Sequence, residues 1–503
     1  MLCDFILEPL LRKMIFVCSG DTLESLKFPL DSTFMYMTAS ADEIAARQQI
    51  FRDFLNDREF TGKTGEAHEQ LKRLKELARS LGDFRIHTNE ELIYSLMELL
   101  LFVDAVEAMD AAYSAASKLK SERLRDMFMR IRNLTEDRQY INLKNWLYSL
   151  DHVLRSVKSV TLGVNLDAQL NVSEVGLVSI NDQPYVNNKI LDRVIRDHQP
   201  QPEFTCIASV GIHEDGGLFS KSVININRGL YNTLNDMYKG TLKNLNRYLT
   251  SEVQEAVLSL LSVEDELDFI LSAVKYVNSL KESGMCISWP VISEKTELSR
   301  LYNPLLIGKC PVKDIVPSSV RFNEDGRIYI LTGPNSGGKT VYITAIGQAQ
   351  IMFQLGLPVC AVSAEMCVYE KILTHFILPT VKASESRLAN EAERMKESLS
   401  KVSKNTLILL DETFSSTSAY DGMILAEALI KYLGNIGCHA VYVTHLLDLN
   451  GKVRDLEGVK MLCAAVENGV RTYEIVPHTG DVPISSMARD IAENSGLGFL
   501  FDD

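Results

Sequence analysis

The amino-terminal third of the chain carries apolar residues at helical spacing. From Asp42 to Asn133 they recur every three or four positions, as at Leu92 and Leu96, and no proline interrupts them. This pattern predicts a mainly helical core, which we assign to residues 1–159.

The pattern of apolar and polar residues changes twice further along the chain. Short β-prone runs, such as residues 160–164 and 222–226, are broken by Asn, Gly and Pro and predict a small strand-rich connector or reduced clamp over residues 160–228. From Leu230 to Leu280 helical spacing returns with no proline and a single glycine, Gly240, which predicts long lever helices over residues 229–289 that end at Trp289-Pro290.

From residue 290 to residue 503, β-like segments alternate with helix-like ones around glycine turns. This alternation is typical of an α/β domain with a largely parallel sheet. A chain of 503 residues has the length for about two to four domains, so both kinds of region are expected to have cores of their own.

The composition excludes some classes of protein. A formal net charge of −14 counts against coating nucleic acid through bulk electrostatics, although a local basic face remains possible. No run reaches about 18 apolar residues, so we expect no membrane span. The first residues, Met1 to Phe5, include an acid and no basic residue, which argues against a secretory signal and favours the cytoplasm.

One segment has the order β-run, glycine-rich turn, helix-like run. The turn matches G-x-x-x-x-G-K-[ST] and consists of Gly333, Pro334, Asn335, Ser336, Gly337, Gly338, Lys339 and Thr340. Such a turn lets backbone N–H groups converge on phosphate oxygens at a helix N-terminus. We expect Lys339 to bind the β- and γ-phosphates of ATP and Thr340 to bind Mg²⁺. The alternative, a chance glycine turn, is disfavoured by the flanking strand and helix.

A second apolar run, residues 406–410, leads into Asp411 and Glu412. We expect a buried strand that ends at the phosphate site, where Asp411 holds Mg²⁺ and Glu412 polarises the attacking water as general base. An acid directly after the metal-binding Asp favours an ATPase over a small-molecule kinase. Taken alone, the run could be an ordinary strand that ends in solvated acids.

A third strand-like run, residues 439–444, leads to His445. A histidine there could sense the γ-phosphate or steady the attacking water beside Glu412. A structural histidine at a strand end is the alternative, and the order of the three elements favours the catalytic role.

Taken in order, these residues resemble the ATPase domain of the MutS family of DNA mismatch repair and recombination proteins. The similarity rests on the Gly-Pro-Asn form of the turn at 333–339, on the acid pair with its Thr-Ser-x-x-Asp-Gly turn at 411–422, on Thr444-His445, and on residues 473–477 and 488–492. The resemblance implies an α/β P-loop ATPase domain of the ABC type at the C-terminus, preceded by a mainly helical core and lever region with a small strand-rich module.

The resemblance also implies a homodimer through the ATPase domain. In such proteins a signature segment of one subunit completes the partner's ATP site, and Ser386 with Glu391 has the matching position and spacing. A plain amphipathic helix is the alternative for this segment, because charged residues flank it.

Upstream, residues 47–57 and 268–274 look like the opening and the close of the family's helical core. Because the chain starts almost at that core, we expect no amino-terminal domain with a mismatch-reading aromatic-x-Glu motif, and at most a few-fold preference for a mismatched duplex.

The function that follows is an ATP-gated dimeric clamp that grips double-stranded or branched DNA in repair or recombination, with no membrane partner. Basic residues that would contact phosphates are Lys239, Lys243, Arg247 and a second group of Lys118, Lys120, Arg123, Arg125, Arg130 and Arg132. Solvated helix faces are the alternative for both groups. The runner-up function is an ABC-type switch whose helical arms grip a protein.

Overall fold

The computed structural model describes most of the chain. The described residues are 37–81, 92–116, 118–155, 158–166, 168–169, 172–184, 251–323, 325–334, 337–376, 387–414, 417–446, 448–467 and 470–478. They fall into two compact units, one within residues 1–58, 119–124 and 269–503 and the other within residues 59–118 and 125–268. These limits differ from the predicted domain limits, because residues 1–58 and 119–124 of the predicted core and residues 269–289 of the predicted lever region belong to the unit that contains the P-loop.

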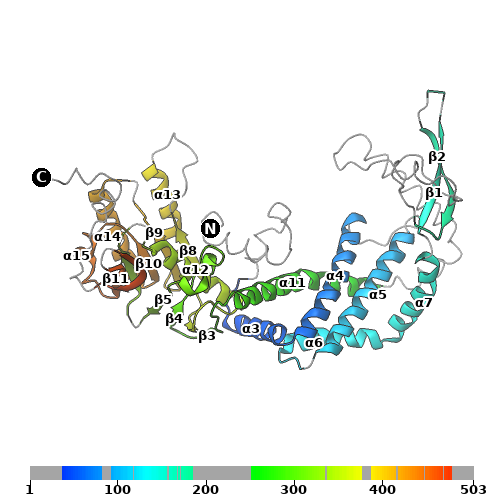
Figure 1. Ribbon diagram of the computed structural model, residues 1–503, viewed down its shortest axis with the longest axis horizontal. Coiled ribbons are helices and arrows are strands. Elements are labelled where there is room, and N and C mark those ends of the chain that lie inside the picture. The colour runs from blue at the N-terminus through cyan, green and yellow to red at the C-terminus, as the bar shows by residue number, and fades with distance from the viewer. Residues whose placement is uncertain are drawn as a thin grey trace. The chain divides into compact units, whose positions relative to one another are not determined.

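The second unit is helical, in agreement with the apolar spacing of its sequence. Its main helices are α4 (Arg58–Leu81), α5 (Leu92–Ala115), α6 (Glu122–Glu136), α7 (Arg138–Arg155) and the first part of α11 (Ser251–Glu282), seen in Figure 1. Aromatic pairs join α4 to α6, α5 to α6 and α5 to α7; these pairs are Phe60–Phe128, Tyr113–Phe128 and Phe102–Tyr140. The helices therefore pack around a shared apolar core.

A charged cluster also joins α4 to α11. Lys75 pairs with Glu264 and, at 2.6 Å, with Asp265, while Nε2 of His68 lies 3.5 Å from Glu264 Oε1. Burial raises the pKa of Glu264, but the hydrogen bonds and charges of His68 and Lys75 outweigh it and lower the pKa to about 2. Glu264 is thus held as a carboxylate between the two helices.

Helix α11 ends earlier than the sequence suggested. It stops at Glu282, ahead of Trp289-Pro290. Gly284, with φ of 82°, donates its N–H to the carbonyl of Lys281, and Met285 donates to that of Leu280. This is the Schellman arrangement that terminates helices at a left-handed glycine, so the prediction of the end point was wrong by several residues.

The predicted strand-rich module begins with a hairpin. Strands β1 (Ser159–Leu166) and β2 (Val172–Asn181) pair antiparallel from Ser159↔Asn181 to Leu166↔Val172. Residues 185–250, which include the run at 222–226 and the basic residues at 239–247, lie outside the described residues.

The P-loop unit is built on a six-stranded sheet, and the prediction of a largely parallel sheet is confirmed. Its strands in spatial order are β12 (Val470–Pro477), β11 (Val459–Glu467), β6 (Ile328–Thr332), β10 (His439–Val443), β9 (Thr406–Asp411) and β8 (Lys371–His375). Only the β11–β12 pair is antiparallel in this sheet. Every residue of β6, β9 and β10 is buried, as expected of central parallel strands covered on both faces.

Helices cover the two faces. One face carries Ile330, Ile408 and Tyr442 and packs with α14 (Ala419–Ile436) through Leu429 and Leu433. The helix α12 (Lys339–Gln354) also contacts β9 and β10, but none of its residues belongs to the apolar cluster that contains α14. Because alternate side chains of a strand point to opposite faces, α12 covers the other face of the sheet. Because β6, β10 and β9 are adjacent, their carboxyl ends meet at one edge of the sheet.

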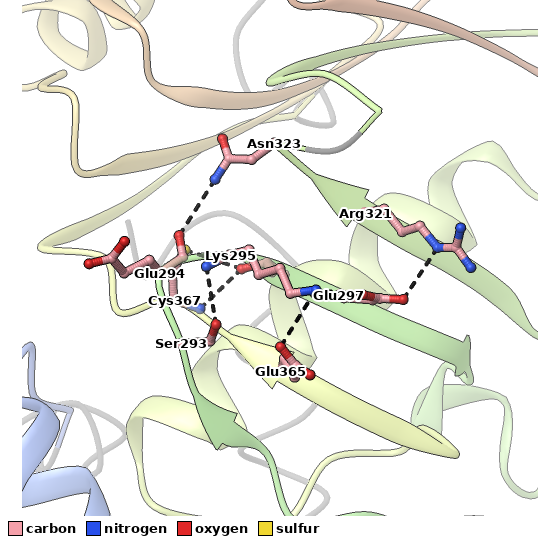
Figure 2. A network of polar contacts seen from close by, with 9 residues as sticks. Ser293, Glu294, Lys295, Glu297, Arg321, Asn323, Glu365 and Cys367 are labelled. Carbon is pink, nitrogen blue, oxygen red and sulfur yellow. Dashed lines mark hydrogen bonds and ion pairs between the residues drawn. The ribbon is translucent and has the colours of Figure 1, made fainter.

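A smaller sheet of order β3-β7-β4-β5 lies in the same unit. Its strands are β3 (Val291–Ile292), β7 (Ser363–Met366), β4 (Thr296–Leu301) and β5 (Ser318–Phe322). Opposite charges alternate across it: Lys295 pairs with Glu297 and Glu365, and Arg321 pairs with Glu297 (Figure 2). The cross-strand pairs Lys295–Glu365 and Arg321–Glu297 stabilise this exposed face.

Helix α3 (Ala41–Asn56) packs at the far end of α12. A Cβ on Gly356 would lie 2.5 Å from the Cβ of Arg47, and Gln354 Nε2 donates to the carbonyl of Thr38 at 2.9 Å. Gln48 Nε2 donates to the carbonyl of Pro290 at 3.0 Å. The helix that begins at the P-loop is therefore anchored to α3 at its other end.

None of the helices in the described part of the chain has the length and apolar character needed to span a bilayer.

Candidate nucleotide site

The P-loop connects β6 to α12 through a turn that only glycine permits. Gly333 has φ of 133° and Gly338, the residue before the helix, has φ of 91°. A Cβ at Gly333 would lie 2.9 Å from the Cβ of Ala464 in β11, and one at Gly337 would lie 2.9 Å from the carbonyl oxygen of Pro334. The turn thus folds tightly against β11, with the start of α12 open to an anion. Asn335 and Ser336 lie outside the described residues.

Lys339 is the first residue of α12 and is 5% exposed. Its Nζ donates to the carbonyls of Gly333 and Pro334 at 2.8 and 2.9 Å. Burial lowers the pKa of Lys339, and the charges of Glu412 and Asp411 oppose that effect. A buried ammonium inside a glycine turn is suited to binding phosphate oxygens.

The acid pair lies where β9 ends, next to the start of α12. The hydroxyl of Thr340 donates to Oδ2 of Asp411 at 2.9 Å, although the residues are 71 positions apart in sequence. Asp411 is 8% exposed, and its Oδ1 has no hydrogen-bond partner among the described residues. Burial raises the pKa of Asp411, while the hydrogen bond from Thr340 and the charge of Lys339 lower it. A hydroxyl and a carboxylate with a spare oxygen fit Mg²⁺, which binds hard oxygen ligands.

Glu412 follows directly and has a left-handed backbone, with φ of 51°, as does Phe414, with φ of 67°. A non-glycine residue in this region stores roughly 1–3 kcal/mol of strain and is retained only where other contacts hold it. Strained residues of this kind cluster at functional sites, which supports a role for this loop.

A cavity of about 600 Å³ extends from the P-loop and Glu412. Its far wall comes from the segment 301–318 and from Tyr473 of β12. Asn303 ties that segment to α12, because its Nδ2 donates to Val341 O at 2.9 Å and to Thr344 Oγ1 at 2.7 Å. This volume lies within the range of small-molecule and cofactor sites, roughly 300–1,000 Å³.

Sequence reasoning did not find this far wall. The lining residues that it missed are Leu301, Asn303, Leu306, Cys310, Asp314, Ile315, Val316, Ser318 and Tyr473. Tyr473 belongs to the run 473–477 that carries the family resemblance, but nothing in that run points to the cavity. The other residues form no local motif.

Of the predicted site residues that the structure describes, Gly333, Pro334, Asp411 and His445 are absent from the lining of the cavity, and the first three are hydrogen-bonded to Lys339 or Thr340, which line it. His445 is exposed and is absent from the lining of the cavity, although Val443, two positions earlier, pairs with both Leu331 and Asp411. It therefore lies past the ends of the P-loop strand and the acid strand. Ser386 is outside the described residues.

The second basic group is partly used in ion pairs. Arg123 lies 2.7 Å from Glu43, and Arg132 lies 2.9 Å from Asp110. Four other members are exposed and form no ion pair with another described residue: Lys118, Lys120, Arg125 and Arg130.

Comparison with known proteins agrees with this architecture. Residues 39–283 match a family model described as the MutS2 N-terminal domain, and residues 329–482 match one described as MutS domain V. The chain is 29% identical over 255 residues to the DNA mismatch repair protein MutS of Fervidobacterium nodosum, which is 45% of this chain and 31% of that protein. It is 24% identical over 479 residues to the protein of the same name from Aquifex pyrophilus, which is 85% of this chain and 54% of that protein.

The parallel sheet, the glycine turn and the acid pair at its edge define a protein of the P-loop class. With both family models matched in order along the sequence, the chain belongs to the MutS family. It spans about a third to a half of the length of the curated relatives that it matches.

Proposed function

We propose that this chain binds ATP with Mg²⁺, hydrolyses it, and uses the nucleotide to gate binding to DNA. The observation that carries the first part is the contact between Thr340 and Asp411 beside the buried ammonium of Lys339, because Thr340 and Lys339 line a cavity of about 600 Å³. Membership of the MutS family supports the second part.

Each residue of the site has its own role in this proposal. The N–H groups at the start of α12 and the ammonium of Lys339 bind the phosphates, and Thr340 and Asp411 hold Mg²⁺, which offsets charge on the phosphate oxygens. Glu412, which lines the cavity, accepts the proton of the attacking water. His445, exposed beyond the end of β10, would reach the γ-phosphate or the water only when the nucleotide is bound.

Two variants test these roles. Lys339→Ala should abolish tight ATP binding, because it removes the phosphate-binding charge, whereas Glu412→Gln should keep binding and slow hydrolysis. Isothermal titration with ATP and Mg²⁺ and a phosphate-release assay measure the two properties. Equal loss of nucleotide binding in both variants would contradict the assignment.

We further propose a homodimer through the P-loop unit, with Ser386 of one subunit contacting the nucleotide of the other. The support is the position of the signature segment, which leads into α13 (Arg387–Leu399) ahead of the acid pair. Light scattering of Glu412→Gln with ATP and Mg²⁺ should detect the dimer. A monomer at micromolar concentration under every nucleotide condition would rule it out.

DNA is the proposed partner because of the family and because exposed Lys and Arg side chains are available in the helical region, including Lys118, Lys120, Arg125 and Arg130. ATP would shift an open–closed equilibrium by binding one state better than the other. The alternative is that the helices grip a protein, which the net charge of −14 favours.

The discriminating experiment measures ATPase activity with and without homoduplex, mismatched and branched DNA, together with a salt series of gel shifts. Stimulation by DNA and binding that weakens with salt support the proposal. Neither effect at low salt would favour the protein partner.

A further inference from the structure

The loop that carries Glu412 is strained and must be held in place. Glu412 and Phe414 both occupy the left-handed region, and neither is a glycine. The contacts that hold this loop therefore also determine where the carboxylate of Glu412 lies.

Two strands supply part of the support. From β10, the carbonyl of Val443 accepts the N–H of Glu412 at 2.9 Å, and the hydroxyl of Tyr442 donates to the carbonyl of Thr413 at 2.9 Å. From β8, Nδ1 of His375 lies 3.1 Å from Oγ1 of Thr413. These contacts fix the first two residues of the loop and leave the conformation of the third to other elements.

Two helices hold that third residue. The backbone N–H of Phe414 donates to Oε1 of Glu391, on α13, at 2.6 Å. On its other side, the carbonyl oxygen of Phe414 packs closely against Gly422 of α14. A Cβ at position 422 would lie 3.0 Å from that oxygen, so any residue other than glycine would have to displace it. A hydrogen bond to a carboxylate is shorter and stronger than one between neutral groups. Glu391 thus links α13 to the strained loop through its side chain.

We infer that Glu391 is a positioning residue for Glu412. Its carboxylate holds the N–H of Phe414, which keeps the loop in its strained conformation and keeps Glu412 on the wall of the cavity beside Lys339. The inference rests on the proposed ATP hydrolysis and adds its regulation: a displacement of α13 would switch the general base while leaving the phosphate-binding residues in place.

Three substitutions at one position test this role. Glu391→Ala removes the acceptor, Glu391→Asp keeps the charge but shortens its reach, and Glu391→Gln keeps both an acceptor oxygen and the length. We expect kcat for ATP hydrolysis to fall about tenfold or more in the Ala and Asp variants, with KM and the Kd for ATP changed less than about threefold. The Gln variant should retain kcat within about threefold of the wild type.

The matched control is Glu393→Ala, because Glu393 is an exposed carboxylate two positions along the same helix. It should hydrolyse ATP at the wild-type rate. If the Ala variant at 391 does not fold, the contrast between Asp and Gln decides. Wild-type kcat in the Asp and Ala variants, or a Gln variant as slow as the Ala variant, would overturn the inference. So would an equal change in kcat and in the Kd for ATP, which indicates a merely structural role.

A double variant separates this inference from the function on which it rests. If Glu391 acts through Glu412, adding Glu391→Ala to Glu412→Gln should slow hydrolysis no further, and an additional tenfold fall, about 1.4 kcal/mol, would show that it acts elsewhere. A wild-type chain without ATPase activity overturns the proposed function itself, whereas an active wild type with independent effects at 391 and 412 overturns only the positioning role.

Discussion

The hydroxyl of Thr340, at the start of α12, donates to Oδ2 of Asp411, at the end of β9, across 2.9 Å. The parallel order β6-β10-β9 brings the two residues together, and Oδ1 of Asp411 stays buried without a partner among the described residues. This pair is the structural basis for the first prediction.

Asp411→Asn should make ATP binding insensitive to Mg²⁺. The amide oxygen can still accept from Thr340, but the negative charge that Mg²⁺ requires is gone. Titration of ATP with Mg²⁺ and with EDTA measures the ratio of the two affinities, which should fall toward one. Asp455→Asn is the control, because its side chain is 88% exposed. An unchanged ratio in Asp411→Asn would place the metal elsewhere.

Tyr473→Ala should weaken ATP binding. The tyrosine lines the cavity, and its ring Cδ1 lies 3.7 Å from the position of a Cβ on Gly338. Loss of an aromatic contact of about 1 kcal/mol raises Kd roughly fivefold. Tyr473→Phe should retain the affinity, and Val470→Ala, at an exposed position of the same strand, is the control. Equal affinities for the Ala variant and the wild type would exclude the ring from the nucleotide site.

Gly356→Ala should destabilise the unit that contains the P-loop. With φ of 86°, an alanine carries a strain of about 1–2 kcal/mol, and its Cβ would lie 2.5 Å from that of Arg47, which adds about 1–3 kcal/mol of overpacking. Gly308→Ala isolates the strain, because Gly308 has φ of 82° and open space around it. Urea unfolding gives the free energy of unfolding of both variants. If Gly356→Ala loses no more stability than Gly308→Ala, helix α3 moves aside at no cost in free energy.

His439 should make stability depend on pH. Burial, and then the charge of Arg327, lower its pKa from 6.5 to about 4. Its Nε2 lies 2.9 Å from Asn323 Oδ1 and its Nδ1 lies 2.7 Å from the hydroxyl of Tyr369, an arrangement that suits a neutral ring.

Because the folded pKa of His439 is the lower one, its contribution is complete above pH 6.5 and is lost as pH falls toward 4. Between pH 7 and pH 5 the loss in free energy of unfolding is about 2 kcal/mol. His439→Gln should lack this part of the pH dependence, so the difference between the two proteins, measured by urea unfolding at each pH, should shrink toward pH 5. A constant difference would mean that folding does not change the pKa of His439.

Features that depend on neighbouring residues could be predicted from the sequence, whereas contacts between distant segments could not. The P-loop at 333–340 and the acid pair at 411–412 were predicted correctly as features of strand ends, because a glycine turn or a buried apolar run leaves its pattern within a few neighbouring residues. The helical spacing ended at Leu280, close to the observed end of α11 at Glu282, but the helix is terminated by Gly284 and not by Trp289-Pro290.

The amino-acid sequence by itself determined the helical and α/β regions, the parallel sheet, the glycine-rich turn between β6 and α12, and the family. Each of these depends on the periodicity of side chains or on the backbone freedom of glycine, which act over short distances along the chain. Only the tertiary structure decided that Tyr473 and Asn303 close the cavity, that Glu391 holds the loop of Glu412, and that α3 packs on α12. These contacts join segments that are brought together only when whole helices and strands pack. The residue type of a tyrosine, an asparagine or a glutamate does not indicate which distant segment it will contact.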